Sequence, residues 1–451
     1  MKNTKKFKLN PSMQIVLGFI ALILLGTFLI SLPISNTNGK WLSFTDSLFT
    51  STSAVCVTGL TTVDTSTQFT LFGQFVVLSL IQIGGLGVIA LTSLVILLLR
   101  KKLTLNNRMA LQQDINKDTM QDIIKFIKKT ILITFAIEGI GALSLLYSTI
   151  TYSGSFWKGL YYAVFMAISS FCNAGFDVLG TEATKFTSLS AFAVNVTILL
   201  PLIFLIIIGG IGYVVLIGGF KNIRSRQHTK VVLFMTLILL IGGTITFLIC
   251  EWNNPNTIGN MNFGYKVLNS FFQSTSSRTA GIASLDQSNL TAISKLTTML
   301  LMFIGGSPNS MAGGIKTTTL FLILLFIFKA PNSKGYIHFN GKQIDQKLVM
   351  KALRVFLLST LAILITIIFV RIFEPNHIST ESIIFESISA FSTTGLSMGI
   401  TPKLTTYSKI LLSSLMFIGR VGITTIMMAI SSKNLSIVSE GIEYPTSDII
   451  I

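Results

Sequence analysis

Apolar residues gather into eight long runs along the chain, and shorter, half-apolar segments lie between some of them. A helix needs about 20 apolar residues to cross a bilayer, and each run is long enough to do so. The runs cover residues 13–33, 70–99, 128–150, 189–219, 230–250, 292–328, 349–372 and 407–431. The pattern predicts eight membrane-spanning helices, an even number that leaves both chain ends on one side.

A shorter segment lies between each odd-numbered run and the even-numbered run that follows. These segments are Phe44–Ala54, Trp157–Phe171, Tyr265–Ser277 and Glu381–Phe391. Each is too short to cross a bilayer and leads into a cluster of small residues, which is typical of a re-entrant element. Irregular backbone is tolerated at membrane depth only where it faces protein or water. Four such segments therefore predict a shared aqueous axis.

The short segments end in related motifs, so the chain contains an internal repeat. In each motif a glycine follows Thr or Ala and precedes an apolar residue: Val57-Thr58-Gly59-Leu60, Asn173-Ala174-Gly175-Phe176, Thr279-Ala280-Gly281-Ile282 and Thr393-Thr394-Gly395-Leu396. A second motif recurs in each following run: Ile83-Gly84-Gly85-Leu86-Gly87, Ile208-Gly209-Gly210-Ile211-Gly212, Ile304-Gly305-Gly306-Ser307-Pro308 and Ile418-Gly419-Arg420-Val421-Gly422. The linked motifs predict an all-α polytopic membrane protein with four helix–pore loop–helix repeats around a central pore.

The runs and motifs together predict the boundaries of these units. We expect a cytoplasmic N-terminus (1–12), four repeats (13–105, 120–222, 228–330 and 347–432) and a cytoplasmic C-terminal tail (433–451). The second helix of the third repeat is expected to break at 305–316, because proline removes a helix hydrogen bond.

The loop glycines point to a selectivity filter made of backbone carbonyls. Carbonyls that turn toward one axis can replace the water around a bare cation, and the required backbone angles are open mainly to glycine. A filter for divalent cations would carry acidic side chains, and none of the four loops has one. We predict that the filter comprises Val57, Thr58, Gly59, Asn173, Ala174, Gly175, Thr279, Ala280, Gly281, Thr393, Thr394 and Gly395. The alternative is that the glycines only let helices pack closely.

Composition and charge support a membrane protein. Hydrophobic residues make up 51% of the chain and charged residues 11%, whereas a soluble chain carries about 25% charged residues. The net charge of +17 is concentrated in the N-terminus and alternate connections, which predicts that both termini are cytoplasmic. Nucleic acid is not expected as a partner, because no basic surface is interleaved with aromatic residues. The basic connections are expected to contact membrane lipid.

The Val57-Thr58-Gly59-Leu60 loop, its three partners and the broken sixth span resemble the Trk/Ktr/HKT superfamily of cation transporters. With eight spans, the chain is most similar to the membrane subunits of bacterial Ktr potassium uptake systems, of KtrB or KtrD type. The resemblance implies K⁺ transport in the cell membrane and no enzyme activity. It also implies a homodimer and a cytosolic ring of RCK-type subunits (KtrA/KtrC type). It places any nucleotide on that partner, and no cofactor is expected in this chain.

The broken sixth span is a candidate gate. Interrupted membrane helices tend to flank conduction paths, and the resemblance implies an intramembrane loop in the third repeat. The predicted gate residues are Gly305, Gly306, Ser307, Pro308, Asn309, Ser310, Met311, Ala312, Gly313, Gly314 and Lys316. The alternative is a static kink.

Arg420 occupies the position that Gly85, Gly210 and Gly306 hold in the other repeats. An Arg at this depth costs at least about 2.5–3.5 kcal/mol on insertion scales, so it should face water or carbonyl groups. We predict that it forms an electrostatic barrier to cations and belongs to the gate. The alternative is a structural arginine bonded to neighbouring carbonyls.

Further charges lie at membrane depth. Arg278 and Glu386 flank two of the loops and are expected to form an ion pair, unless both reach external water. Glu138 is expected to pack between helices rather than carry protons. The half-apolar C-terminal tail is expected to contact another subunit.

A proton- or Na⁺-coupled carrier is the alternative function. Carriers typically show two-fold repeats and relays of intramembrane carboxylates, whereas this chain has four repeats and one acid in the middle of a span.

Overall fold

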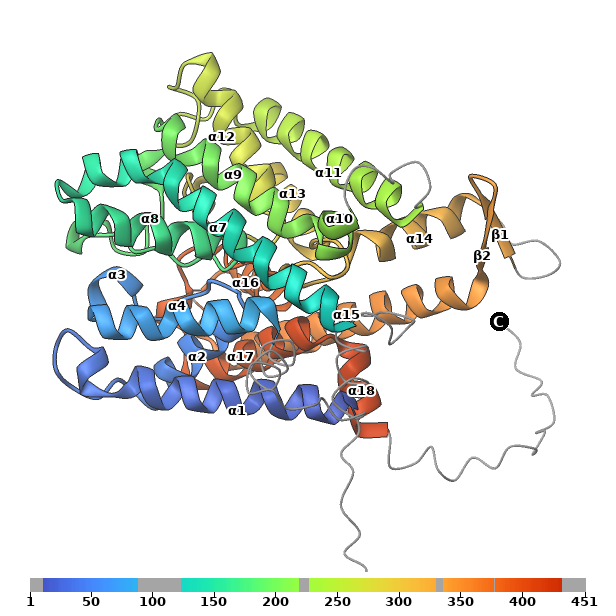
Figure 1. The fold of residues 1–451 in the computed structure, drawn as a ribbon, viewed down its shortest axis with the longest axis horizontal. Coiled ribbons are helices and arrows are strands. Elements are labelled where there is room, and N and C mark those ends of the chain that lie inside the picture. The colour runs from blue at the N-terminus through green and yellow to red at the C-terminus, as the bar shows by residue number, and fades with distance from the viewer. Residues whose placement is uncertain (1–10, 88–122, 219–226, 330–335, 377, 432–451) are drawn as a thin grey trace, which may run out of the picture.

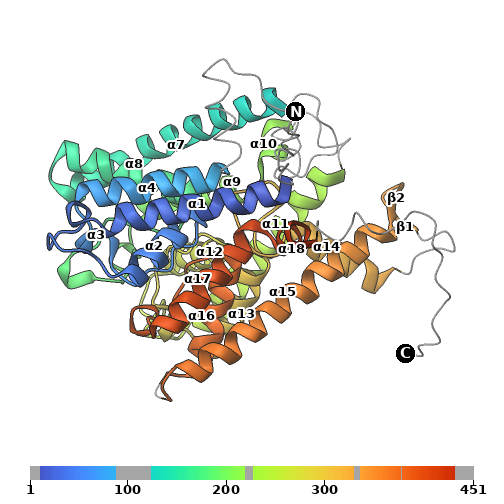
Figure 2. The same cartoon turned by 90° about the horizontal axis from the view of Figure 1, so that it is seen from below.

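The computed structural model describes residues 11–87, 123–218, 227–329, 336–376 and 378–431. It is largely helical, and its long helices run side by side (Figures 1 and 2). The C-terminal tail and most of the first two basic connections lie outside the described residues. The predictions of tail burial and of topology that depend on them therefore stay predictions.

The first helix of each repeat is long and apolar. These helices are α1 (Pro11–Ser31), α7 (Ile123–Ser153), α11 (Gln227–Glu251) and α15 (Gln346–Phe373). Among the described residues these four are long and apolar enough to cross a membrane, and a bent pair of helices makes a fifth candidate. Large apolar side chains such as Leu143, Ile249 and Leu357 are exposed on them. Such faces are stable in contact with lipid.

A short helix follows each long one, in agreement with the predicted re-entrant segments. These helices are α2 (Phe44–Val55), α8 (Phe156–Phe171), α12 (Phe263–Ser276) and α16 (Thr380–Ser392). The N-caps of α2 and α16 are serines: Ser43 accepts a hydrogen bond from the N–H of Asp46, and Ser379 accepts one from Ser382. Such caps satisfy backbone donors that the first turn leaves free. The C-terminal halves of the four helices are buried and lead into the glycine motifs.

The second helices are broken more often than the sequence predicted. They are α4 (Leu71–Leu86), α9 (Val196–Ile211) with α10 (Tyr213–Gly218), α13 (Ala292–Phe303) with α14 (Thr317–Phe328), and α17 (Thr406–Val421) with α18 (Ile423–Ser431). Only the sixth run was expected to be interrupted. The second helices of repeats 2 and 4 also break, at the last glycine of the second motif, where Gly212 and Gly422 have φ of 97° and 88°. In repeat 1, α4 ends just before the matching Gly87, whose φ is 90°. At Gly422 the helix turns by 93°.

The four repeats close into a ring. Each second helix packs against the short helix of the next repeat: α4 on α8, α9 on α12, α13 on α16, and α17 back on α2. Polar side chains join the same pairs of helices. In three of the second helices the contact is made by a residue in the first turn. Lys295 pairs with Glu381 at 3.6 Å, and Lys409 pairs with Asp46 at 2.8 Å. At the matching place in α4, Gln74 accepts a hydrogen bond from Tyr161 at 2.8 Å.

A small β-hairpin is an exception to the predicted all-α fold. Strands β1 (Tyr336–Phe339) and β2 (Lys342–Asp345) pair antiparallel between α14 and α15. In Figure 1 the hairpin lies beyond the helices at one end of the molecule. Its turn, Asn340-Gly341, has φ of 46° and 74°, as a two-residue turn of the Asn-Gly kind requires.

Candidate functional site

The predicted filter segments share one backbone conformation. In each repeat two residues, separated by one, have positive φ: Val57 and Gly59 (58° and 91°), Asn173 and Gly175 (56° and 73°), Thr279 and Gly281 (72° and 74°), and Thr393 and Gly395 (51° and 95°). A positive φ is uncommon for residues other than glycine and persists only where surrounding structure holds it. The same unusual path at four matched places marks these loops as a repeated functional element.

The four loops meet. A Cβ atom built on Gly59 would lie 2.6 Å from the carbonyl oxygen of Ala174, and one on Gly175 would lie 3.0 Å from that of Ala280. A Cβ on Gly281 would overlap the carbonyl oxygen of Thr394, and one on Gly395 would overlap that of Thr58. Each glycine thus lies against a carbonyl of the next repeat, and the fourth returns to the first. The structure therefore brings all four predicted loops together in one closed ring.

Serines at the ends of the short helices support the ring. Ser53 and Ser389 accept hydrogen bonds from the N–H groups of Gly59 and Gly395, each at 3.0 Å. Ser169 donates to the carbonyl of Phe176. In the third repeat the matching residue is Thr275, and its neighbour Ser276 donates instead to the carbonyl of Ile282. The sequence analysis assigned no role to these serines, although a serine lies six residues before the loop glycine in three of the four repeats.

Removing one of these serines should weaken the filter. Ser53→Ala leaves the part-buried N–H of Gly59 without its partner, and an unsatisfied buried donor costs up to about 1–3 kcal/mol. We expect a lower unfolding temperature and a lower ratio of K⁺ to Na⁺ flux in vesicles. Ser414→Ala is the control, because Ser414 is exposed and bonds only within its own helix, to the carbonyl of Ile410. Equal ratios in the two variants would contradict this role.

Several side chains in the loops have no partner. The buried Thr58, Thr279 and Thr393 hydroxyls and the Asn173 amide lack hydrogen bonds within the part of the chain that the structure describes. Buried polar groups are nearly always bonded, and the exceptions concentrate where water or an ion binds. These groups lie where a cation pathway is expected.

The second motif packs against the ring. Cβ atoms built on Gly84, Gly209 and Gly419 would overlap the carbonyl oxygens of Val55, Phe171 and Phe391, which end the short helices of the same repeats. Here the glycines allow close packing, as the alternative interpretation held. In the third repeat the matching Gly305 lies against the carbonyl of Gly313 instead, because the chain between α13 and α14 folds back.

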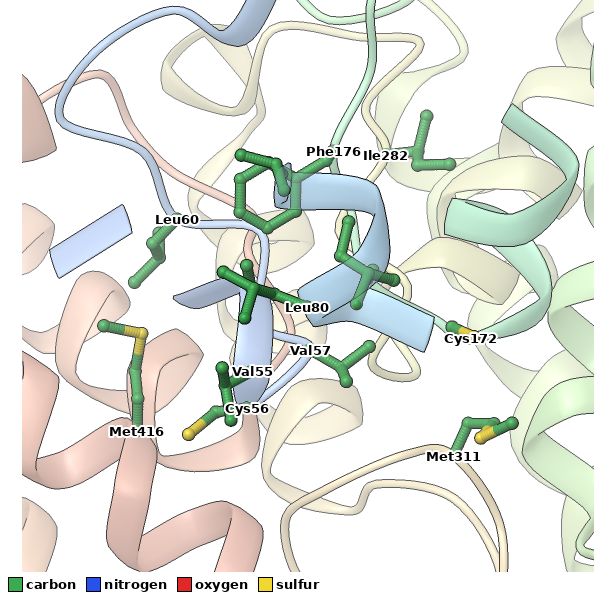
Figure 3. Close-up of a cluster of buried hydrophobic side chains, with 14 of the residues drawn as sticks. Val55, Cys56, Val57, Leu60, Leu80, Cys172, Phe176, Ile282, Met311 and Met416 are labelled. Atoms are coloured by element: carbon green, nitrogen blue, oxygen red, sulfur yellow. The ribbon is translucent and has the colours of Figure 1, made fainter. Parts of the chain in front are cut away.

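This returning chain contains the predicted gate, residues 305–316, and it lies directly beside the filter loops. Gly313 packs against the Thr393 side chain, and Gly305 against that of Thr279. Ile304 and Ile315 form a β-bridge that closes the loop at its base. Met311 belongs to the same large cluster of buried side chains as Val57 and Cys172 (Figure 3). Its N–H donates to the carbonyl of Gly209, so the loop also contacts repeat 2.

Two cations lie at the loop. Lys316 donates to the carbonyl of Ala312 at 2.6 Å. Arg420 donates to the carbonyl of Met311 in the loop and to the carbonyls of Gly84 and Gly85 at 2.5 and 3.1 Å. Arg420 thereby caps the last turn of α4, whose carbonyls have no partner within the helix. These contacts fit the alternative interpretation, in which Arg420 is a structural arginine bonded to neighbouring carbonyls. They also place its positive charge beside the loop.

The predicted ion pair between Arg278 and Glu386 is wrong. Glu386 accepts hydrogen bonds from the hydroxyls of Ser397 and Thr401, which follow its own loop. No ion pair joins it to Arg278, whose Nε has no partner among the described residues. Glu138 packs between helices as expected: it is buried and accepts a hydrogen bond from Gln82 of α4 at 3.1 Å.

Carboxylates also follow the loops of repeats 1 and 2. Asp64 accepts hydrogen bonds from Ser66 and Thr67 and from the N–H of Phe186. Burial raises the pKa of the Asp177 carboxyl to about 6, and the negative charge of Asp64 adds to the shift. Negative charge beside the mouth of a pore raises the local concentration of cations.

A ring of four matched loops, each set between apolar helices, is the arrangement of a membrane protein that passes cations. The chain belongs to the TrkH family of cation transport proteins, whose family model matches residues 5–437. This membership agrees with the resemblance in the sequence and with the expectation that the chain is not an enzyme.

Comparisons with individual proteins agree with this family membership. The chain is 39% identical to the potassium/sodium uptake protein NtpJ of Enterococcus hirae, over 96% of this chain and 95% of the relative. It is 38% identical to the Ktr system potassium uptake protein B of Bacillus subtilis, over 99% and 98%. The crystal structure of the potassium transporter TrkH from Vibrio parahaemolyticus has the same fold, with a TM-score of 0.73 and 18% identity over 95% of this chain and 86% of that one.

Proposed function

We propose that the chain is the K⁺-translocating subunit of a Ktr-type uptake system, through which K⁺ moves passively along the membrane potential. The ring of loop glycines, each against a carbonyl of the next repeat, carries this proposal. Neutral carbonyls suit a weakly hydrated monovalent ion, which must bind and then leave. The names of the relatives, which include potassium and sodium uptake, support the same ion class.

In this proposal the filter comprises the twelve loop residues from Val57 to Gly395 named above, and residues 305–316 form the gate. The loop fits this role because it lies against Thr279 and Thr393, whose hydroxyls have no partner among the described residues. Withdrawal of the loop would let water reach them. Arg420 adds positive charge that opposes cation passage.

The proposal also covers the assembly in which the chain works. We place the protein in the cell membrane with both termini in the cytoplasm, as a homodimer. A cytosolic ring of RCK-type subunits binds the nucleotide and controls the gate. Relatives named as parts of a Ktr system support a multi-component assembly.

Ion flux into vesicles that contain the purified protein tests the function. We expect uptake of K⁺ and Rb⁺ to exceed that of Na⁺, to follow an imposed voltage and to ignore a pH gradient. Glu138→Gln serves as a control, because it removes the carboxylate that a proton-coupled carrier would need in the middle of its span. Uptake that follows the pH gradient and is lost in Glu138→Gln would favour the carrier.

A further inference from the structure

The break in the fourth span leaves backbone groups without partners. Helix α9 ends at Ile211, and α10 begins at Tyr213 after Gly212. The last carbonyls of a helix and the first N–H groups of the next have no partner within their own helix. At membrane depth each such group needs a partner, which is either another protein group or the water of a pore.

The loop of the third repeat supplies these partners. The N–H groups of Ser307 and Met311 donate to the carbonyls of Gly210 and Gly209 at 3.0 and 3.3 Å. In return, the N–H of Tyr213 donates to the carbonyl of Asn309 at 2.9 Å. Three backbone hydrogen bonds thus hold the loop to the broken helix of repeat 2.

One side chain completes this attachment. The hydroxyl of Tyr213 bonds to that of Thr134 on α7 at 2.8 Å and reaches the sulfur of Met311 at 3.6 Å. Tyr213 and Met311 are both buried. The backbone and the side chain of Tyr213 therefore contact the loop at two points, while Thr134 fixes the orientation of the ring.

We propose that Tyr213 is a positioning residue that latches the gate loop to repeat 2, and that the loop opens only when this latch releases. The proposal rests on the proposed function and adds a holding point on repeat 2, separate from Arg420. When the loop moves, the carbonyls of Gly209 and Gly210 lose their partners. Those groups must then be hydrated, so the latch favours the closed loop.

Removal of the Tyr213 hydroxyl tests the latch. In vesicles that contain this chain without any cytosolic partner, we expect Tyr213→Phe to raise Rb⁺ uptake about 2- to 10-fold, the effect of losing one ordinary hydrogen bond. Met311→Leu removes the sulfur atom that the Tyr213 hydroxyl contacts, and it should raise Rb⁺ uptake by a similar factor. Because the two substitutions remove the same contact, Rb⁺ uptake in the double variant should rise by less than the two single effects combined.

The control is Tyr152→Phe, which removes a tyrosine hydroxyl that bonds to the carbonyl of Leu179, outside the loop. Its uptake should equal that of the wild type. Replacing 305–316 with a continuous Ala/Leu helix is the reference for an unlatched pore. Suppose that this replacement raises Rb⁺ uptake while Tyr213→Phe and Met311→Leu leave it unchanged or lower it. The proposal of a Tyr213 latch is then wrong, and the proposed transport function is unaffected. If no variant passes more Rb⁺ than empty vesicles, the proposed function fails as well.

Discussion

Replacing Gly395 with serine should cut K⁺ uptake at least about 10-fold and lower the ratio of K⁺ to Na⁺ flux. Gly395 has a φ of 95°, and a Cβ there would overlap the carbonyl oxygen of Thr58 in the first repeat. Holding a side chain at such an angle costs about 1–3 kcal/mol. The overlap must also displace the carbonyl of Thr58, which belongs to the proposed filter. The filter should therefore lose its geometry even if the helices stay folded.

Gly399, four residues further on, provides a matched control. It too has a positive φ, of 80°, but a Cβ on it would meet nothing within 4 Å. Gly399→Ser carries the same type of backbone strain without the overlap. We expect it to lower the unfolding temperature, since the strain costs about 1–3 kcal/mol of folding free energy. K⁺ uptake should stay within about twofold of the wild type, because no carbonyl is displaced. Equal K⁺ uptake in Gly395→Ser and Gly399→Ser would show that transport does not depend on the ring of carbonyls.

The repeat and the re-entrant helices could be predicted from the sequence because the ring needs the same small residues in every repeat. Gly59, Gly175, Gly281 and Gly395 each have a positive φ and lie against a neighbouring backbone, so a larger residue is strained at all four places. The apolar runs predicted the long helices, since helices that face lipid need apolar surfaces. The order in which the repeats close depends on contacts between distant segments, and the motifs do not encode it.

The helix breaks were missed for a different reason. Gly212 and Gly422 lie within apolar runs, where a glycine is equally consistent with close helix packing. The break at Gly212 becomes visible only when the partners of the freed backbone groups are known, and these come from the third repeat. The proline of the sixth run was a local signal, so that break was predicted.

Two other differences have local causes. The interpretation of Glu386 relied on the depth of two charges, and it overlooked Ser397 and Thr401 in the same repeat as nearer donors. The β-hairpin had a sequence signal in Asn340-Gly341. That signal was hidden because the connection was considered only for its basic charge.

Arg420→Gln should increase K⁺ or Rb⁺ uptake at least about fivefold. Two unit charges about 4 Å apart repel by about 1 kcal/mol even in water, and by about 4 kcal/mol at an effective dielectric constant of 20. Removing the charge therefore lowers the barrier. Glutamine also has fewer donors for the carbonyls of Met311, Gly84 and Gly85. The unfolding temperature should fall, because buried carbonyls lose their partners.

Arg420→Lys separates the charge from the hydrogen bonds. Lysine keeps the positive charge but cannot reproduce the planar fork of donors by which the guanidinium joins the loop to the last turn of α4. If the charge is the barrier, uptake in the lysine variant should stay near that of the wild type while its unfolding temperature falls as in the glutamine variant. If the hydrogen bonds hold the loop closed, lysine and glutamine should raise uptake alike, and the electrostatic barrier would have to be abandoned. Unchanged uptake in both variants would show that Arg420 only caps the last turn of α4.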